Sequence, residues 1–197
     1  MADAFVLDCI FAAGAIVAKA SMFDGLYDED LVVSPNAVRL ARLNAGAPVL
    51  NTHRQDDVRR VIGAVVPGSA RIESGLGMAR LRFSKEPVDS DIVGKIRDDL
   101  IKGVSIGYVQ HRIEEVDRPH ALRPLRRVVD WEPYEISVCP IGADPGAMLL
   151  RQITPAALAR SRMMASRHSA CRPVPSTLAS QALARMRMRE AAAKGRR

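Results

Sequence analysis

The chain has 197 residues, a hydrophobic fraction of 48% and a mean hydropathy close to zero, which predict a globular protein rather than a disordered one. Three cysteines without a CxxC pair exclude a disulfide scaffold, and no apolar run is long enough for a membrane-spanning helix. The most apolar segment near the start, residues 6–20, contains Asp8 and is not preceded by a basic region, so we expect no signal peptide. Aromatic residues make up only 4%, so we expect a core of Val, Ile, Leu and Ala. The net charge of +7 by itself favours nucleic acid as a partner.

The positive charge is concentrated at the C-terminal end of the chain. Residues 155–197 hold ten Lys and Arg residues against one Glu, whereas residues 1–154 hold 19 basic residues against 21 acidic ones. The body is therefore slightly acidic, and only the tail is suited to nucleic acid. We predict a domain over 1–152 and a basic, Ala- and Arg-rich tail over 153–197, partly disordered or helical. This tail is either a solvated segment or a docking segment for a partner, with a helix expected over 176–193.

The body is predicted to consist of short strands around one helix. In chain order, the patterns predict strands over 58–66 and 78–83, a helix over 88–102, and strands over 104–113 and 127–138. Strands outnumber helices and do not alternate regularly with them. A β-rich α+β fold, with a mixed or mostly antiparallel sheet and packed helices, is therefore favoured over a parallel α/β sheet.

The predicted helix has the clearest periodicity in the chain. Apolar residues recur at a spacing of four, at Ile92, Ile96 and Leu100. Asp89 or the following serine can cap its start, and Gly103 stands where a glycine often ends a helix.

The serine motif Gly103-Val104-Ser105-Ile106-Gly107 matches G-x-S-x-G. In the nucleophile elbow of α/β-hydrolases, the serine lies between a strand and a following helix. Here the order is helix, serine, strand, which excludes that elbow. Ser105 with its small neighbours fits a nucleophile that a substrate backbone can approach closely, and it equally fits a buried serine bonded to backbone.

A nucleophilic serine needs a base. His53 is the best candidate, because it follows an apolar approach over 48–52 and precedes a charged loop. His111 lies six residues from Ser105, which is roughly 20 Å along an extended strand, too far to reach it. His120 lies in a Pro- and Arg-rich loop and His168 in the tail.

The base in turn needs an orienting carboxylate. Glu135 lies between Tyr134 and Ile136 in an apolar strand, where a buried charge requires a partner, whereas Glu132 lies nearer the end of the strand. Pro133 removes a backbone donor, so the strand is expected to be at an edge or bulged there. No metal-ligand spacing and no phosphate-binding loop is present, so we expect no metal and no cofactor.

Four stretches together resemble the procapsid (prohead) maturation proteases of tailed bacteriophages. In the order of that family they are 48–53, 61–63, 100–108 and 131–147, and the last two are the more specific. The resemblance covers about residues 20–150, while residues 1–20 match nothing clearly. It implies a closed β-barrel with surrounding helices, like the herpesvirus assembly proteases.

The resemblance also implies roles and partners. Ser105 would be the nucleophile, His53 the general base and Glu135 the third member, with Glu132 as the alternative. The implied function is a serine endopeptidase that cleaves scaffold, or the scaffolding segment of the capsid protein, inside the procapsid in the host cytoplasm, and that also cleaves itself. A homo-oligomer is left open. The alternatives are an inactive capsid-assembly protein and a basic nucleic-acid-binding protein.

Overall fold

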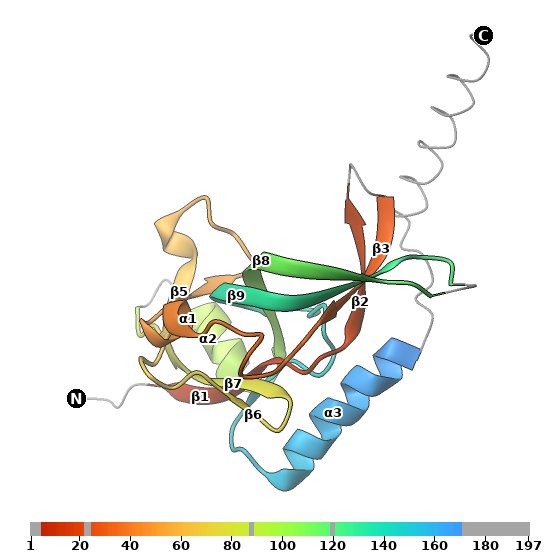
Figure 1. Cartoon of the computed structure of the whole chain (residues 1–197). Coiled ribbons are helices and arrows are strands. Elements are labelled where there is room, and N and C mark those ends of the chain that lie inside the picture. Colours follow the sequence, from red (N-terminus) through yellow and green to blue (C-terminus); the bar gives the residue numbers. More distant parts are fainter. Residues whose placement is uncertain (1–4, 22–24, 87–88, 119–120, 171–197) are drawn as a thin grey trace, which may run out of the picture.

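The computed structural model describes residues 5–21, 25–86, 89–118 and 121–170, and Figure 1 shows them as a β-rich fold with one long helix along its side. The helices are α1 (Ala41–Asn44), the 3₁₀ turn η1 (Val58–Arg60), α2 (Ser90–Arg97) and α3 (Pro155–Ala170). The strands are β1 (Val6–Ala12), β2 (Ile16–Ser21), β3 (Gly25–Leu31), β4 (Pro48–Asn51), β5 (Val61–Val65), β6 (Arg71–Glu73), β7 (Leu76–Phe83), β8 (Gly103–Val116), β9 (Leu125–Cys139) and β10 (Met148–Leu150).

The central strands close into a barrel. The hydrogen-bonded order is β9, β4, β5, β7, β1, β10 and β8, and β8 pairs with β9 again. Within this circle the β4–β9 pair is parallel and the other pairs are antiparallel. The β2–β3 hairpin is attached outside the circle through a parallel pair between β3 and the far end of β9. The predicted closed, mostly antiparallel barrel is confirmed.

Two long strands, β8 and β9, extend beyond the barrel as a hairpin. Their inner halves close the barrel, and the outer half of β9 carries β3. Both predicted strands are confirmed, and both are longer than predicted. The expected bulge is also present, because Gly107 pairs with Glu135 while the next residue, Tyr108, pairs with Pro133. Tyr134 is therefore the extra residue of the bulge.

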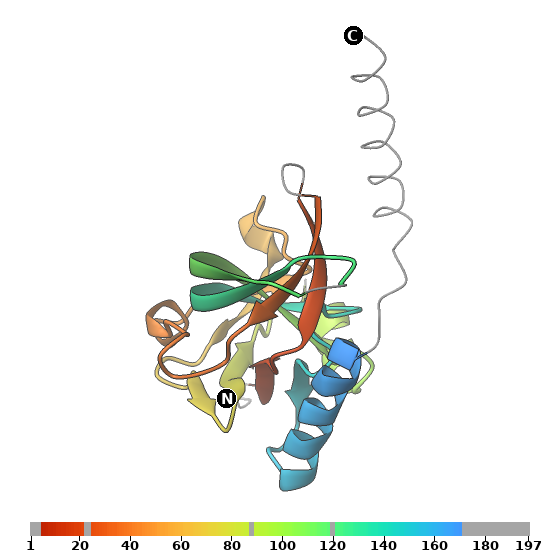
Figure 2. The ribbon, with the colours of Figure 1, turned by 45° about the vertical axis from the view of Figure 1, so that its right-hand side comes forward.

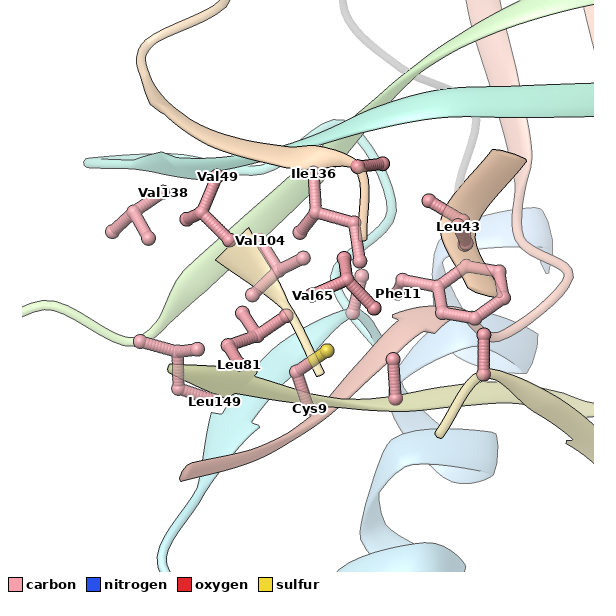
Figure 3. Close-up of a cluster of buried hydrophobic side chains, with 14 of the residues drawn as sticks. Cys9, Phe11, Leu43, Val49, Val65, Leu81, Val104, Ile136, Val138 and Leu149 are labelled. Atoms are coloured by element: carbon pink, nitrogen blue, oxygen red, sulfur yellow. The ribbon is translucent and has the colours of Figure 1, made fainter. Parts of the chain in front are cut away.

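The core of the barrel is aliphatic, as the composition predicts. Figure 3 shows side chains of β4, β8 and β9 (Val49, Val104, Ile136) meeting those of β1 and β7 (Cys9, Leu81) across the interior. Each buried Val, Leu or Ile side chain contributes roughly 1.5–3 kcal/mol, so many medium-sized contacts stabilise this barrel. The pattern over 78–83 is confirmed, since the arginines of β7 are exposed and their neighbours are buried.

Two predicted boundaries are wrong, and each has a local cause. Residues 58–60 form η1 rather than a strand, because the Asp57 carboxylate accepts a hydrogen bond from the Arg59 N–H at 2.9 Å and caps the turn. Helix α2 ends at Arg97 instead of residue 102. Asp99 takes a φ of 64°, and the N–H of Leu100 donates to the carbonyl of Lys95 at 2.9 Å. This is a Schellman ending, here made by an aspartate.

The N-terminal segment, which matched no pattern, supplies a central strand of the barrel. β1 lies between β7 and β10 and is almost wholly buried.

At the other end of the body, α3 lies along the barrel beside the β2–β3 hairpin (Figure 2). Ser161 of α3 is fully buried and donates to the Gly146 carbonyl at 2.6 Å. The start of the predicted tail is thus a packed helix, whereas the helix expected over 176–193 lies outside the described residues.

Candidate active site

The geometry of the site begins with strand β4. It runs parallel to β9, with Leu50 in register with Ser137, and the N–H of Thr52 continues the pairing by donating to the Val138 carbonyl at 3.1 Å. β4 ends at Asn51, and the two residues that follow it have left-handed backbone conformations, with φ values of 55° at Thr52 and 59° at His53. A non-glycine residue in this region costs on the order of 1 kcal/mol, and such strain concentrates at functional sites.

His53 and Glu135, two of the residues singled out from the sequence, are in direct contact. The Nδ1 atom of His53 lies 2.6 Å from Oε1 of Glu135, and the bond joins residues 82 positions apart in the chain. The histidine side chain is 39% exposed, whereas the glutamate side chain is 1% exposed. Because a buried carboxylate without a partner is strongly unfavourable, this contact also stabilises the fold of β9.

Ser137 connects the same two residues a second time. Its Oγ accepts a hydrogen bond from the backbone N–H of His53 at 2.9 Å and donates one to Oε2 of Glu135 at 2.7 Å. The side chain has no exposed surface. His53, Ser137 and Glu135 therefore form a closed ring of hydrogen bonds.

Ser105 lies directly across from this ring. It is half-buried near the start of β8, and its cross-strand partner is Ser137. Directly paired residues share one face of the sheet with Cβ atoms about 4.5–5.5 Å apart. Ser105 is therefore placed beside the hydroxyl that holds the backbone of His53.

Glycines on either side of Ser105 allow this close packing. A Cβ atom at Gly107 would lie 2.5 Å from Oε1 of Glu135, and one at Gly103 would lie 2.5 Å from the Cys139 carbonyl oxygen. The G-x-S-x-G pattern thus reflects the contact between β8 and β9. Gly103 begins a strand and does not end the helix as predicted.

Cys139 was not singled out from the sequence, yet it belongs to the site. Hydrogen bonds with the Cys139 side chain and with the Glu135 carboxylate raise the pKa of His53 from 6.5 to about 9, against the opposing effect of burial. Glu135, Ser137 and Cys139 alternate along β9, so they share one face. That alternation was the signal in the sequence for the two missed residues.

The other candidates lie elsewhere. Glu132, the alternative carboxylate, lies with Oε2 3.5 Å from Nε2 of His111 on the outer part of the hairpin. The structure thus brings Glu135, and not Glu132, to His53. His120 lies outside the described residues, as does the side chain of His168.

A small cavity adjoins the serine. It has a volume of about 50 Å³ and is lined by Ser105 and Ile106 of β8, by Val17 and Lys19 of β2, and by Ala143 of the loop after β9. Beyond Gly103, which pairs with Met148, β8 has no strand partner on this side among the described residues. The site therefore has open space next to the candidate nucleophile.

Among the described residues, no group of three or more His, Cys, Asp or Glu side chains is arranged to hold a metal ion. No helix in the described ranges is both long and apolar enough to cross a membrane.

A histidine–carboxylate pair beside a cross-strand serine, on a closed β-barrel, defines a candidate serine-hydrolase site. Residues 16–158 match the family model described as "Caudovirus prohead serine protease". This match covers most of the chain, so the chain belongs to the caudovirus prohead serine protease family. The family resemblance inferred from four short stretches is confirmed.

Two further proteins are similar to the chain. The major capsid protein of Halomonas phage phiHAP-1 is 32% identical over 113 residues, which is 57% of this chain and 18% of that protein. The chain thus spans less than a fifth of that relative's length. The crystal structure of KSHV protease in complex with a hexapeptide phosphonate inhibitor is similar with a TM-score of 0.42 and 12% identity, covering 85% of this chain and 77% of that one.

The contact between Gly107 and Glu135 generates a prediction. Gly107→Ala places a methyl carbon 2.5 Å from Oε1 of Glu135 and 2.8 Å from the Tyr134 ring, so we expect the carboxylate to shift relative to His53. We expect the pKa of His53, measured by NMR titration, to fall from about 9 toward its ordinary value.

Gly94→Ala is the matched control, because a Cβ atom there meets nothing within 4 Å and the residue lies in helix α2. The His53 titration should be unchanged in this variant. An unchanged titration in Gly107→Ala as well would show that the glycine does not position the carboxylate.

Proposed function

We propose that the chain is a serine endopeptidase in which Ser105 is the nucleophile, His53 the general base and Glu135 the orienting carboxylate. The observation that carries the proposal is the 2.6 Å contact between His53 and Glu135. The Glu135 side chain of this pair and the Ser105 side chain lie on the same face of the sheet, on the neighbouring strands β9 and β8. Membership of a prohead serine protease family supports the same chemistry.

The mechanism follows from the hydrogen-bond directions. With the proton on Nδ1 donated to Glu135, Nε2 of His53 is left as the acceptor for the Ser105 proton. Ser105 Oγ attacks the scissile carbonyl carbon, and protonated His53 then gives its proton to the leaving amine. In the second half, His53 takes a proton from water, the hydroxide attacks the acyl-enzyme, and the proton returns to Ser105 as the ester bond breaks.

The proposed substrates are proteins of capsid assembly. The similar stretch in a relative named as a major capsid protein supports a function in the same assembly, because one polypeptide there contains a region like this chain. We therefore propose that the chain cleaves scaffold or the scaffolding segment of the capsid protein, and itself, inside the procapsid in the host cytoplasm. A division at 152–153, with the tail serving for recruitment, remains part of this proposal.

The two other candidate functions are less well supported. An inactive assembly protein does not require Ser105, His53 and Glu135 together, and the stabilising contact between His53 and Glu135 does not account for the serine on the facing strand. Binding of nucleic acid rests on the tail, most of which lies outside the described residues.

Replacement of the nucleophile is the first test. Co-expression with the capsid protein of the same phage should give processed capsid protein with the wild type and none with Ser105→Ala. Ser166→Ala is the matched control, since this exposed serine of α3 donates its hydroxyl proton to the Met163 carbonyl of its own helix. Processing that persists in Ser105→Ala would remove Ser105 from the mechanism.

The raised pKa of His53 predicts the pH dependence of cleavage. The base must be unprotonated to accept a proton, so kcat/KM should rise about tenfold per pH unit up to a midpoint near 9. Glu135→Gln removes the negative charge that favours the protonated ring, so its midpoint should move to lower pH while the maximal rate falls on the order of 10³-fold or more. A midpoint that stays in place would contradict the assigned contact.

A further inference from the structure

We propose that Ser137 is a positioning residue of the active site: its buried hydroxyl fixes the backbone of His53 and the carboxylate of Glu135 in one arrangement. This inference rests on the proposed function, because it assigns a role within that mechanism. It does not require Ser137 to touch the substrate.

The hydrogen-bond directions around Ser137 are fixed by a donor that cannot change. A backbone N–H can only donate, so the 2.9 Å contact with His53 makes Ser137 Oγ an acceptor there. The hydroxyl proton is then available for Oε2 of Glu135, 2.7 Å away. Glu135 thus accepts at Oε2 from the serine and at Oε1 from Nδ1–H of His53. This chain of donors sets the tautomer that leaves Nε2 of His53 free for Ser105.

The strain in the loop explains why such an anchor is needed. Thr52 and His53 both adopt positive φ, a conformation that persists only when neighbouring contacts hold it. The flanking pairs, Thr52 N–H to Val138 and Arg54 N–H to Asn51, have N···O distances of 3.1 and 3.3 Å. The shorter bond, 2.9 Å from the N–H of His53 to Ser137 Oγ, holds the residue that carries the imidazole.

Burial separates Ser137 from Ser105 in function. Ser137 has no exposed surface, and its hydroxyl is committed to a carboxylate and to a backbone N–H. Ser105, its cross-strand partner, is half-buried and adjoins the cavity. Of two facing serines, one is therefore placed to react and the other to position the base.

The test compares two variants of equal shape. Ser137→Thr keeps the hydroxyl, and Ser137→Val replaces it with a methyl group, so any difference between them is due to hydrogen bonding. We expect kcat of Ser137→Val to be on the order of 100-fold below that of Ser137→Thr, with a similar KM, because a misplaced base affects the chemical step. The NMR titration midpoint of His53 should fall in Ser137→Val and remain near that of the wild type in Ser137→Thr.

Ser69→Ala is the matched control for a buried serine outside the site. Its Oγ accepts from the Arg80 N–H at 3.1 Å and lies 3.4 Å from the Arg80 carbonyl, so it makes similar backbone bonds. This variant should lower the melting temperature without changing kcat or the His53 titration. The same result for Ser137→Val, lower stability with unchanged kcat and titration, would overturn the proposal and leave Ser137 a structural residue.

The outcome also separates this inference from the proposed function. Activity retained by Ser105→Ala would refute the serine mechanism itself. An inactive Ser105→Ala with equal kcat for the Thr and Val variants of Ser137 would refute only the positioning role.

Discussion

A buried carboxylate on the wall of the barrel is the constraint on which the site depends. Glu135 is 1% exposed on a strand that is buried on both faces in this region. Removing a charge from water costs several kcal/mol unless good hydrogen bonds replace the solvent. Here the replacements are the imidazole of His53 and the hydroxyl of Ser137. Burial of Glu135 therefore favours the arrangement in which His53 lies against it, so the same contact that satisfies the carboxylate also assembles the site.

The closure of the barrel brings the third residue to this pair. β8 and β9 are neighbours in the chain and also the seam that completes the circle of strands. Glycines at 103 and 107 keep β8 close to β9 on either side of Ser105. The bulge at Tyr134 changes the register between the inner and outer parts of the hairpin. Glu135 therefore faces the histidine, while Glu132 belongs to the outer arm with His111.

Strands β5, β7, β8 and β9 and helix α2 could be predicted from their sequence patterns, whereas the closed barrel was implied by the family resemblance. The alternation of apolar and polar residues was sufficient to predict β7 and β8 as strands. The sustained run of apolar residues was sufficient to predict β9. β1 was missed because it is buried almost throughout and shows no alternation. The length of α2 was overestimated because Asp99 adopts a conformation that glycine usually supplies.

The site residues were found by residue type and by family resemblance, whereas their contacts depend on strand register. His53 and Glu135 are 82 positions apart, and only the parallel pairing of β4 with β9 brings them together. Register depends on tertiary packing, so local patterns do not determine it. Ser137 and Cys139 could have been noted from their two-residue spacing after Glu135, although their roles follow only from the position of His53.

The most direct test of the central claim is to identify the nucleophile chemically. An alkyl fluorophosphonate reacts with an activated serine hydroxyl and leaves a stable adduct, which peptide mapping by mass spectrometry can locate. With Ser105 as the nucleophile, we expect a single adduct on Ser105 in the wild type, and none when the protein is denatured before labelling. An adduct on Ser137, or on the Cys139 thiol beside the same histidine, with Ser105 unmodified, would contradict it.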